Sequence, residues 1–240
     1  AAEVFLLWVI EGGNDLKAKL PFSKTNLDVK IVDDMQPFRT RKVRILNGAH
    51  TAMVPFSILY GNKTAKQSVD NTFTGEFINK AVFNEIIDTL DMDRNELNSF
   101  ADEIFDRFRN PFIIHILSSI ALNSVSKFTV RVLPSLLEYV KIHNKVPTNL
   151  TYAFAALLRF YKGTWNGETL PVQDSDDIIA KFSDIWKSND YLEVAKNSLG
   201  IQEYWGEDLT KIDNITEAVA LALKEIDTNG IEAGFVNYSK

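Results

Sequence analysis

The sequence contains no cysteine among its 240 residues, which excludes disulfide bonds and thiolate chemistry. It contains only three histidines, so a histidine-rich zinc site is not expected, and we predict no metal centre. No uninterrupted run of about 18 apolar residues is present, and no segment is therefore expected to span a membrane. The opening segment is apolar, but it includes Glu3 and lacks a basic stretch, so it does not resemble a signal peptide.

Positive charge is also sparse. The chain has 26 Lys and Arg residues against 32 Asp and Glu residues, for a net charge of -6. This balance argues against a nucleic acid or an anionic membrane as the partner, although it does not exclude a local basic patch. Hydrophobic residues make up 45% and charged residues 24%, as in globular proteins with a substantial core, and the length suits one large domain or two small ones.

The sequence motifs that bind dinucleotides are missing as well. No Gly-x-Gly-x-x-Gly follows a predicted strand, no series of alternating strands and helices is present, and there is no P-loop. The glycines of segment 230–234 lie in a predicted tail, which is the wrong context for a phosphate site. We therefore expect these residues to bind NADH negligibly and to be inactive by themselves.

The spacing of apolar residues changes from strand-like to helix-like near residue 45. The pattern predicts two short strands, at 4–10 and 27–32, and a turn around Pro37 over 33–41. It then predicts a mainly α, multihelical domain, with the strands confined to about residues 1–35. The expected helices cover 45–60, 73–90, 93–110, 112–122, 128–140, 149–160, 174–186, 190–199 and 214–226.

Several breaks are expected between and within these helices. Pro55 should kink the first helix or end it early. Segment 123–127 is predicted as a polar turn, 163–171 as a loop and 229–240 as a tail. The closely spaced Arg39, Arg41, Lys42 and Arg44 are interpreted either as a solvated loop or as a rim that attracts anions.

One stretch, residues 42–50, combines three groups suited to proton chemistry at the start of a predicted helix. Asn47 and His50 are three residues apart and so share a helix face, which Lys42 can approach from the helix start. A lysine in a dry site can exchange a proton with an alcohol, an amide can hold the oxygen, and an imidazole can orient a neighbouring hydroxyl. The alternative is that Asn47 caps a helix, His50 is half-buried and Lys42 is solvated.

The same stretch resembles the Lys-x-x-x-x-Asn-x-x-His signature of the long-chain mannitol dehydrogenase family. Three other segments are similar to family motifs, and the resemblance is good over about residues 3–140. They are the Trp-Val-Ile-Glu segment at 5–12, the Asp-Asp-x-x-Pro turn at 33–38, and the later helical motifs at 107–111 and 119–127. Within the family the chain looks most like the tagaturonate reductase branch, also called altronate oxidoreductases.

The resemblance implies a role for each matching residue. Lys42 would be the general acid/base, Asn47 would hold the substrate oxygen, and His50 would orient the substrate. Lys127 matches a second lysine of the polyol pocket. Where mannitol-type members have Arg and His, this chain has Ser119 and Leu122, so a polyol-binding set is not intact.

A sugar acid would need a cation for its carboxylate. His115, Arg109 and Arg131 are candidates, since Arg can pair a carboxylate through two hydrogen bonds. The simpler interpretation of His115 is a core residue, and that of each arginine is a surface position. The aromatic residues Phe100, Phe105 and Phe108 are interpreted as core packing.

The resemblance therefore implies that residues 1–240 form one helical substrate-binding and catalytic domain, in which 1–41 lead in from an N-terminal Rossmann domain of the same protein. That domain would bind the NAD. The implied function is a cytoplasmic, metal-independent tagaturonate reductase of hexuronate catabolism. The alternatives are a mannitol/fructose-type polyol 2-dehydrogenase and, from another class, a non-catalytic helical interaction module.

Overall fold

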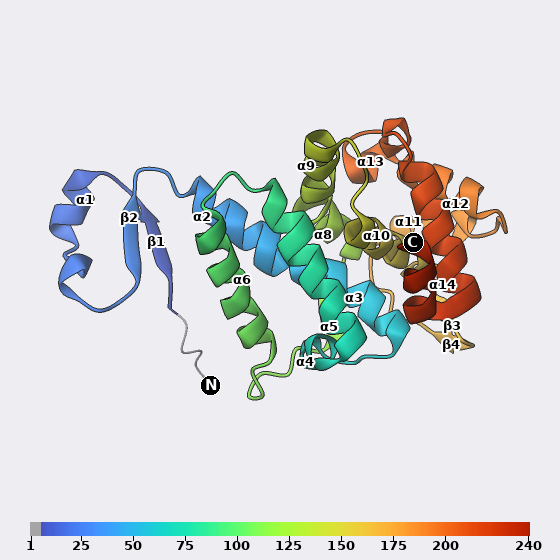
Figure 1. The fold of residues 1–240 in the computed structure, drawn as a ribbon, viewed down its shortest axis with the longest axis horizontal. Coiled ribbons are helices and arrows are strands. Elements are labelled where there is room, and N and C mark those ends of the chain that lie inside the picture. The colour runs from blue at the N-terminus through green and yellow to red at the C-terminus, as the bar shows by residue number, and fades with distance from the viewer. Residues whose placement is uncertain (1–5) are drawn as a thin grey trace.

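The computed structural model describes residues 6–240, which begin with a small unit at one end of the molecule (Figure 1). Strand β1 (Trp8–Glu11) pairs in parallel with β2 (Val29–Val32), with Trp8 opposite Val29. The connection between them contains helix α1 (Asn14–Lys19) and the 3₁₀ turn η1 (Phe22–Lys24). Both predicted strands are present, but they begin later than predicted, at Trp8 and at Val29. Residues 4 and 5 of the first predicted strand lie outside the described residues.

A long helical rod leads from this unit into the body of the protein. Helix α2 (Gln36–Arg41), the π-helix η2 (Lys42–Asn47) and α3 (Gly48–Tyr60) follow one another without a break. The predicted turn over 33–41 is therefore wrong from Gln36 onward, because Pro37 occupies the first turn of α2, where its missing N–H costs nothing.

The rod passes Pro55 and ends only at Gly61, whose φ of 110° is favourable for glycine. The prediction that Pro55 ends the helix early is wrong. Most of α3 is buried from Gly48 to Leu59, and this packing outweighs the lost backbone hydrogen bond.

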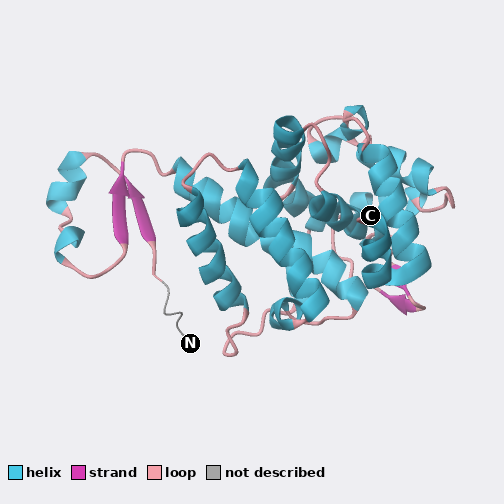
Figure 2. Cartoon of the chain, in the orientation of Figure 1, coloured by secondary structure: helices cyan, strands magenta, loops and turns pink. Residues whose placement is uncertain are grey.

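The remaining helices surround α3 and the central helix α10, and Figure 2 shows that helix predominates throughout this body. Every residue of α10 from Asn149 to Phe160 is buried, and α10 packs against both α3 and the last helix, α14. The mainly α prediction is confirmed. The elements are α4 (Ala65–Asp70), α5 (Thr72–Lys80), η3 (Ala81–Ile86), η4 (Ile87–Thr89), α6 (Arg94–Phe108), α7 (Leu117–Ile120), α8 (Ser124–Arg131), α9 (Leu133–His143), α10 (Thr148–Phe160), β3 (Thr164–Trp165), β4 (Glu168–Thr169), α11 (Asp176–Ile185), α12 (Tyr191–Leu199), α13 (Gln202–Trp205), η5 (Leu209–Lys211) and α14 (Ile215–Tyr238).

The segment predicted as a buried helix over 112–122 is instead largely an exposed loop. Phe112 is 84% exposed and Ile114 74%, and only α7 is helical. The backbone N–H of Ala65 donates to the carbonyl of His115 at 2.9 Å, and the N–H of Leu117 donates to the carbonyl of Lys63 at 3.0 Å. These tertiary hydrogen bonds hold the segment extended, which its apolar composition does not reveal.

Three further boundaries differ from the predictions. The polar turn expected over 123–127 instead forms the N-cap and the first half of α8. The expected loop over 163–171 contains the β3–β4 hairpin around Asn166-Gly167, a pair that favours such a turn. The expected tail continues α14 past a break at Gly230, because Ile231 is buried and its carbonyl accepts a hydrogen bond from the Tyr152 hydroxyl at 3.0 Å. None of the helices described between residues 6 and 240 is long and apolar enough to cross a membrane.

Candidate functional site

The wide turn of η2 determines how Lys42 is placed relative to Asn47. A π-helix bonds residue i to i+5, so two residues five apart lie about one turn from each other. Lys42 therefore lies in the middle of a continuous rod, and not at a helix start as the spacing suggested. His50 follows on α3, one α-helical turn beyond Asn47. Single π-helical turns within α-helices are frequent at functional sites.

Burial differs among these three residues. Asn47 and His50 are partly buried, whereas Lys42 is exposed. Val43 and Leu46 are only partly buried, so they do not enclose Lys42 in a dry site, and the lysine faces solvent.

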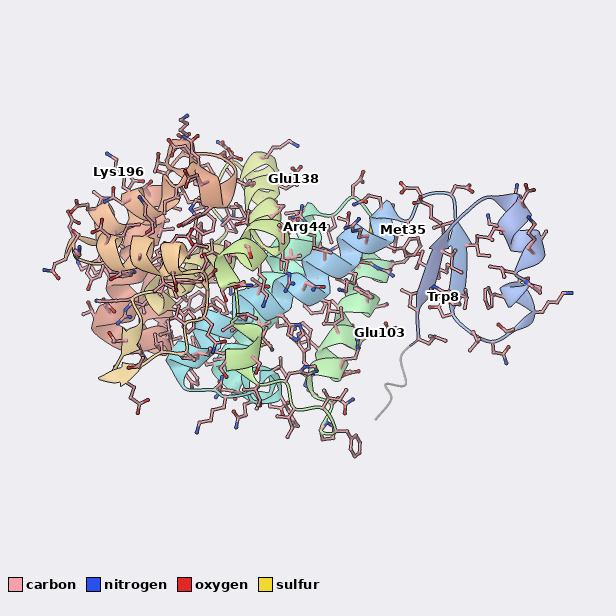
Figure 3. The ribbon with its side chains drawn as sticks, turned by 180° about the vertical axis from the view of Figure 1, so that it is seen from behind. Trp8, Met35, Arg44, Glu103, Glu138 and Lys196 are labelled. Atoms are coloured by element: carbon pink, nitrogen blue, oxygen red, sulfur yellow. The ribbon has the colours of Figure 1, made fainter. Side chains whose placement is uncertain are left out.

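The other basic residues of the rod have structural contacts. Arg41 is buried and its guanidinium lies 4.3 Å from the ring centroid of Phe100. Arg44 donates from Nη1 to the Ser135 hydroxyl at 2.9 Å, and it points toward α9, where Figure 3 labels Glu138. Because they have different neighbours, these side chains form neither a solvated loop nor a single rim.

His50 is held against an aromatic ring. Its imidazole lies 4.3 Å from the ring of Phe108, centroid to centroid, and 5.9 Å from the imidazole of His115. Burial lowers the pKa of His50 to about 4, and the nearby His115, Arg131, Arg107 and Lys42 act in the same direction. The imidazole is therefore neutral at pH 7, with one nitrogen as a donor and the other as an acceptor.

Two buried polar atoms of the site have no hydrogen-bond partner in the described part of the chain. They are Oδ1 of Asn47 and Nε2 of His50. An unsatisfied buried polar group costs about 1–3 kcal/mol. A ligand hydroxyl that reached both atoms could donate to Oδ1 of Asn47 and accept from Nε2 of His50 when that nitrogen carries the proton, and would recover this cost.

Helix α8 supplies two cations, of which Arg131 lies close enough to His50 to lower the pKa of its imidazole. Lys127 is partly buried and donates from Nζ to the carbonyl of Ile120 at 2.9 Å. Burial lowers its pKa, and the neighbouring Arg131 lowers it further. Arg131 is the last residue of α8, and burial lowers its pKa too. The two side chains are close enough to interact electrostatically.

The remaining sequence candidates divide into two groups. His115 lies beside His50, held there by the hydrogen bonds of the 112–116 loop with residues 63–65. Arg109 lies outside this group, because its exposed guanidinium is 3.6 Å from Asp70 and 3.5 Å from Asp106. Ser119 and Leu122 are both exposed.

Two members of the cluster were not anticipated. Phe108 is buried as the core interpretation expects, but it also forms the wall on which His50 rests. Arg107 lowers the pKa of His50, so its charge lies nearby. The motif at 107–111 could have indicated both.

Comparison with known sequences identifies a family and its relatives. The profile of the mannitol dehydrogenase C-terminal domain family matches residues 34–227. An altronate oxidoreductase of Yersinia enterocolitica is 42% identical over 243 residues, which is 99% of this chain and 50% of that protein. The altronate oxidoreductase of Bacillus subtilis is 42% identical over 238 residues, which is 98% of this chain and 48% of that protein. The chain thus spans about half the length of the curated relatives it matches.

Two solved structures share the fold. The mannitol 2-dehydrogenase of Pseudomonas fluorescens, in a ternary complex with NAD and D-mannitol, gives a TM-score of 0.77 at 18% identity, covering 87% of this chain and 42% of that chain. A D-sorbitol dehydrogenase in substrate-free form gives a TM-score of 0.72 at 20% identity, covering 86% of this chain and 42% of that chain. At these identities the comparison shows the fold alone.

Proposed function

The chain belongs to the mannitol dehydrogenase family, matching its C-terminal domain, and we propose on this premise that it is the substrate-binding part of an NAD-dependent altronate oxidoreductase. Such an enzyme interconverts D-altronate and D-tagaturonate. The observation that carries the proposal is the arrangement of Lys42, Asn47 and His50 along η2 and α3, with His115 and Arg131 brought near His50 from distant segments and Lys127 next to Arg131.

The proposed chemistry needs one hydride and one proton. NAD, when bound, supplies or accepts the hydride at C4 of its nicotinamide. During reduction Lys42 donates a proton from its ammonium to the oxygen of the former ketone, and during oxidation its neutral amine accepts that proton. A lysine that does the proton work makes a metal ion unnecessary in this scheme.

The unsatisfied atoms fit the substrate side of this reaction. Oδ1 of Asn47 and Nε2 of His50 are buried without partners. The asparagine amide can also donate from Nδ2 to the reacting oxygen as negative charge develops on it. The neutral imidazole can exchange hydrogen bonds with an adjacent hydroxyl and so orient the carbon chain.

The N-terminal unit supports a further part of the proposal, that another domain binds the cofactor. Trp8 on β1 is 52% exposed and Leu27 beside β2 is 53% exposed (Figure 3 labels Trp8). Parallel sheets occur almost only with both faces covered, and a two-stranded sheet is marginally stable alone. We propose that this pair extends the sheet of a dinucleotide-binding domain, which would also cover the exposed Lys42.

A sugar acid fits the site better than a neutral polyol. Lys42, Arg107 and Arg131 place positive charge near His50, and Lys127 lies next to Arg131, in a chain whose net charge is -6. A neutral polyol has no charge to match this cluster. The grouping of Lys42, Asn47 and His50 with the nearby Arg131 favours an enzyme over a non-catalytic interaction module.

Specificity constants of the full-length protein test the proposal. With NADH in excess, kcat/KM for tagaturonate should exceed kcat/KM for fructose. Equal or better turnover of fructose would make the polyol alternative correct. No NADH oxidation with either ketose would contradict the proposed enzyme.

A further inference from the structure

Three cationic side chains lie near one partly buried histidine, and a fourth lies next to one of them, although the chain as a whole is acidic. Lys42, Arg107 and Arg131 all lower the pKa of His50, and Lys127 interacts with Arg131. Like charges repel, so bringing them together has a free-energy cost unless an anion joins them. Such an arrangement indicates an anion-binding site.

Within residues 6–240, Arg131 differs from the paired arginines of this chain. Arg94 pairs with Asp88, Arg109 with Asp70, and Arg159 with Asp227. Arg131 has no ion pair with any carboxylate of the described residues, and burial lowers the pKa of its guanidinium. A partly buried guanidinium without an anionic partner has lost hydration and has no ion pair in return.

The packing of α8 on the rod places the backbone of Arg131 close to Gly48. A Cβ on Gly48 would lie 3.1 Å from the backbone carbonyl oxygen of Arg131, a tight contact that glycine avoids. The close approach brings the backbone of Arg131 beside the part of the rod that carries Asn47, one residue before Gly48, and His50, two residues after it. The charge of Arg131 also lies close enough to His50 to lower the pKa of its imidazole. A cation is also favourable at the C-terminus of α8.

We propose that Arg131 binds the carboxylate of the sugar-acid substrate, with Lys127 beside it, and that this contact makes the site prefer a keto-uronate to a neutral ketose. The inference rests on the proposed function. The planar guanidinium can bind a carboxylate through two parallel hydrogen bonds. Lys127 offers a single charged group, and one of its hydrogen bonds is already made with Ile120.

Arg131→Met in the full-length enzyme is the direct test. A hydrogen bond to a charged group contributes about 1.5–3 kcal/mol, so KM for the keto-uronate should rise about 10- to 150-fold. The value of kcat should change little, and kcat/KM for fructose should not fall. Arg131→Lys should recover part of the loss, because it restores the charge without the paired geometry.

Arg109→Met is the matched control, because it removes the same side chain from a surface ion pair. It should leave KM for both ketoses unchanged. If it raises KM for the keto-uronate while Arg131→Met does not, the carboxylate is bound by Arg109 and the proposal is wrong. If Arg131→Met lowers kcat/KM equally for both ketoses, Arg131 is structural and the proposal is again wrong.

A second measurement covers the case in which Arg131→Met does not fold. Inhibition constants of an aldonate and of the corresponding alditol are compared in the wild type and in Arg131→Lys. The proposal expects the wild type to favour the aldonate and the lysine variant to lose most of that preference. An unchanged preference would overturn it. Failure of the wild type to reduce any keto-uronate would instead overturn the proposed function.

Discussion

The imidazole rings of His50 and His115 lie 5.9 Å apart, although one is on the central rod and the other is in an exposed loop. The loop reaches His50 because its backbone pairs with residues just beyond the end of α3. Two of the three histidines of the chain thus meet at one place, beside a lysine and two arginines that influence the same ring. This meeting point is the centre of the proposed substrate site.

Lys42→Ala in the full-length enzyme should lower kcat by about 10²–10⁴, the usual contribution of a general acid/base group. The affinity for NADH should be nearly unchanged, because the proposed cofactor site is on another domain. Small primary amines should restore part of the rate to the variant by replacing the missing ammonium. If the variant keeps more than about a tenth of the wild-type kcat, Lys42 is not the acid/base group.

His50 should make folding less favourable in acid. Its pKa is about 4 in the folded protein, against 6.5 ordinarily, so the unfolded chain binds its proton at a higher pH than the folded one. His50 therefore does not reduce the free energy of unfolding above pH 6.5. As the pH falls from 6.5 toward 4, protonation of His50 in the unfolded chain reduces this free energy by up to about 3 kcal/mol.

Urea unfolding of the full-length protein at pH 7 and pH 4.5, for the wild type and for His50→Asn, measures this effect. The variant should lose less stability than the wild type between the two pH values. An equal loss in both proteins would show that His50 is not neutral when the protein is folded.

Glu85 should have the opposite pH dependence. Its buried carboxyl group accepts hydrogen bonds of 2.7 Å from the backbone N–H groups of Asn149 and Leu150, at the start of α10. Burial raises its pKa to about 7, from 4.5, although these hydrogen bonds act against the increase. The folded state therefore binds the proton more tightly, and the resulting stability is present below pH 4.5 and is lost as the pH rises through 7.

Glu85→Ala should destabilise the full-length protein by about 1–3 kcal/mol, because the two N–H groups lose their acceptor. The variant should also lose the part of the pH dependence that lies between 4.5 and 7. Unfolding free energies measured across this range provide the check. If the unfolding free energy of the variant changes with pH as steeply as that of the wild type, a group other than Glu85 is responsible for this pH dependence.

The amino-acid sequence by itself determined the fold class, since helix-like spacing of apolar residues beyond residue 45 requires helices that bury one face. It also identified the residues of the 42–50 stretch and the family, because a motif with its flanks depends only on the order of residues. Both inferences succeed because helix formation and motif recognition depend on residues that are close together in the sequence.

Only the tertiary structure decided how those residues meet. The π-helical turn that aligns Lys42 with Asn47, the extended loop that carries His115, and the close packing at Gly48 that brings Arg131 into place all depend on contacts between segments far apart in the chain. The sequence left Arg109 and Arg131 equivalent as partners for a carboxylate. The fold distinguishes them, because Asp70 and Asp106 pair with Arg109, whereas no carboxylate of the described residues pairs with Arg131.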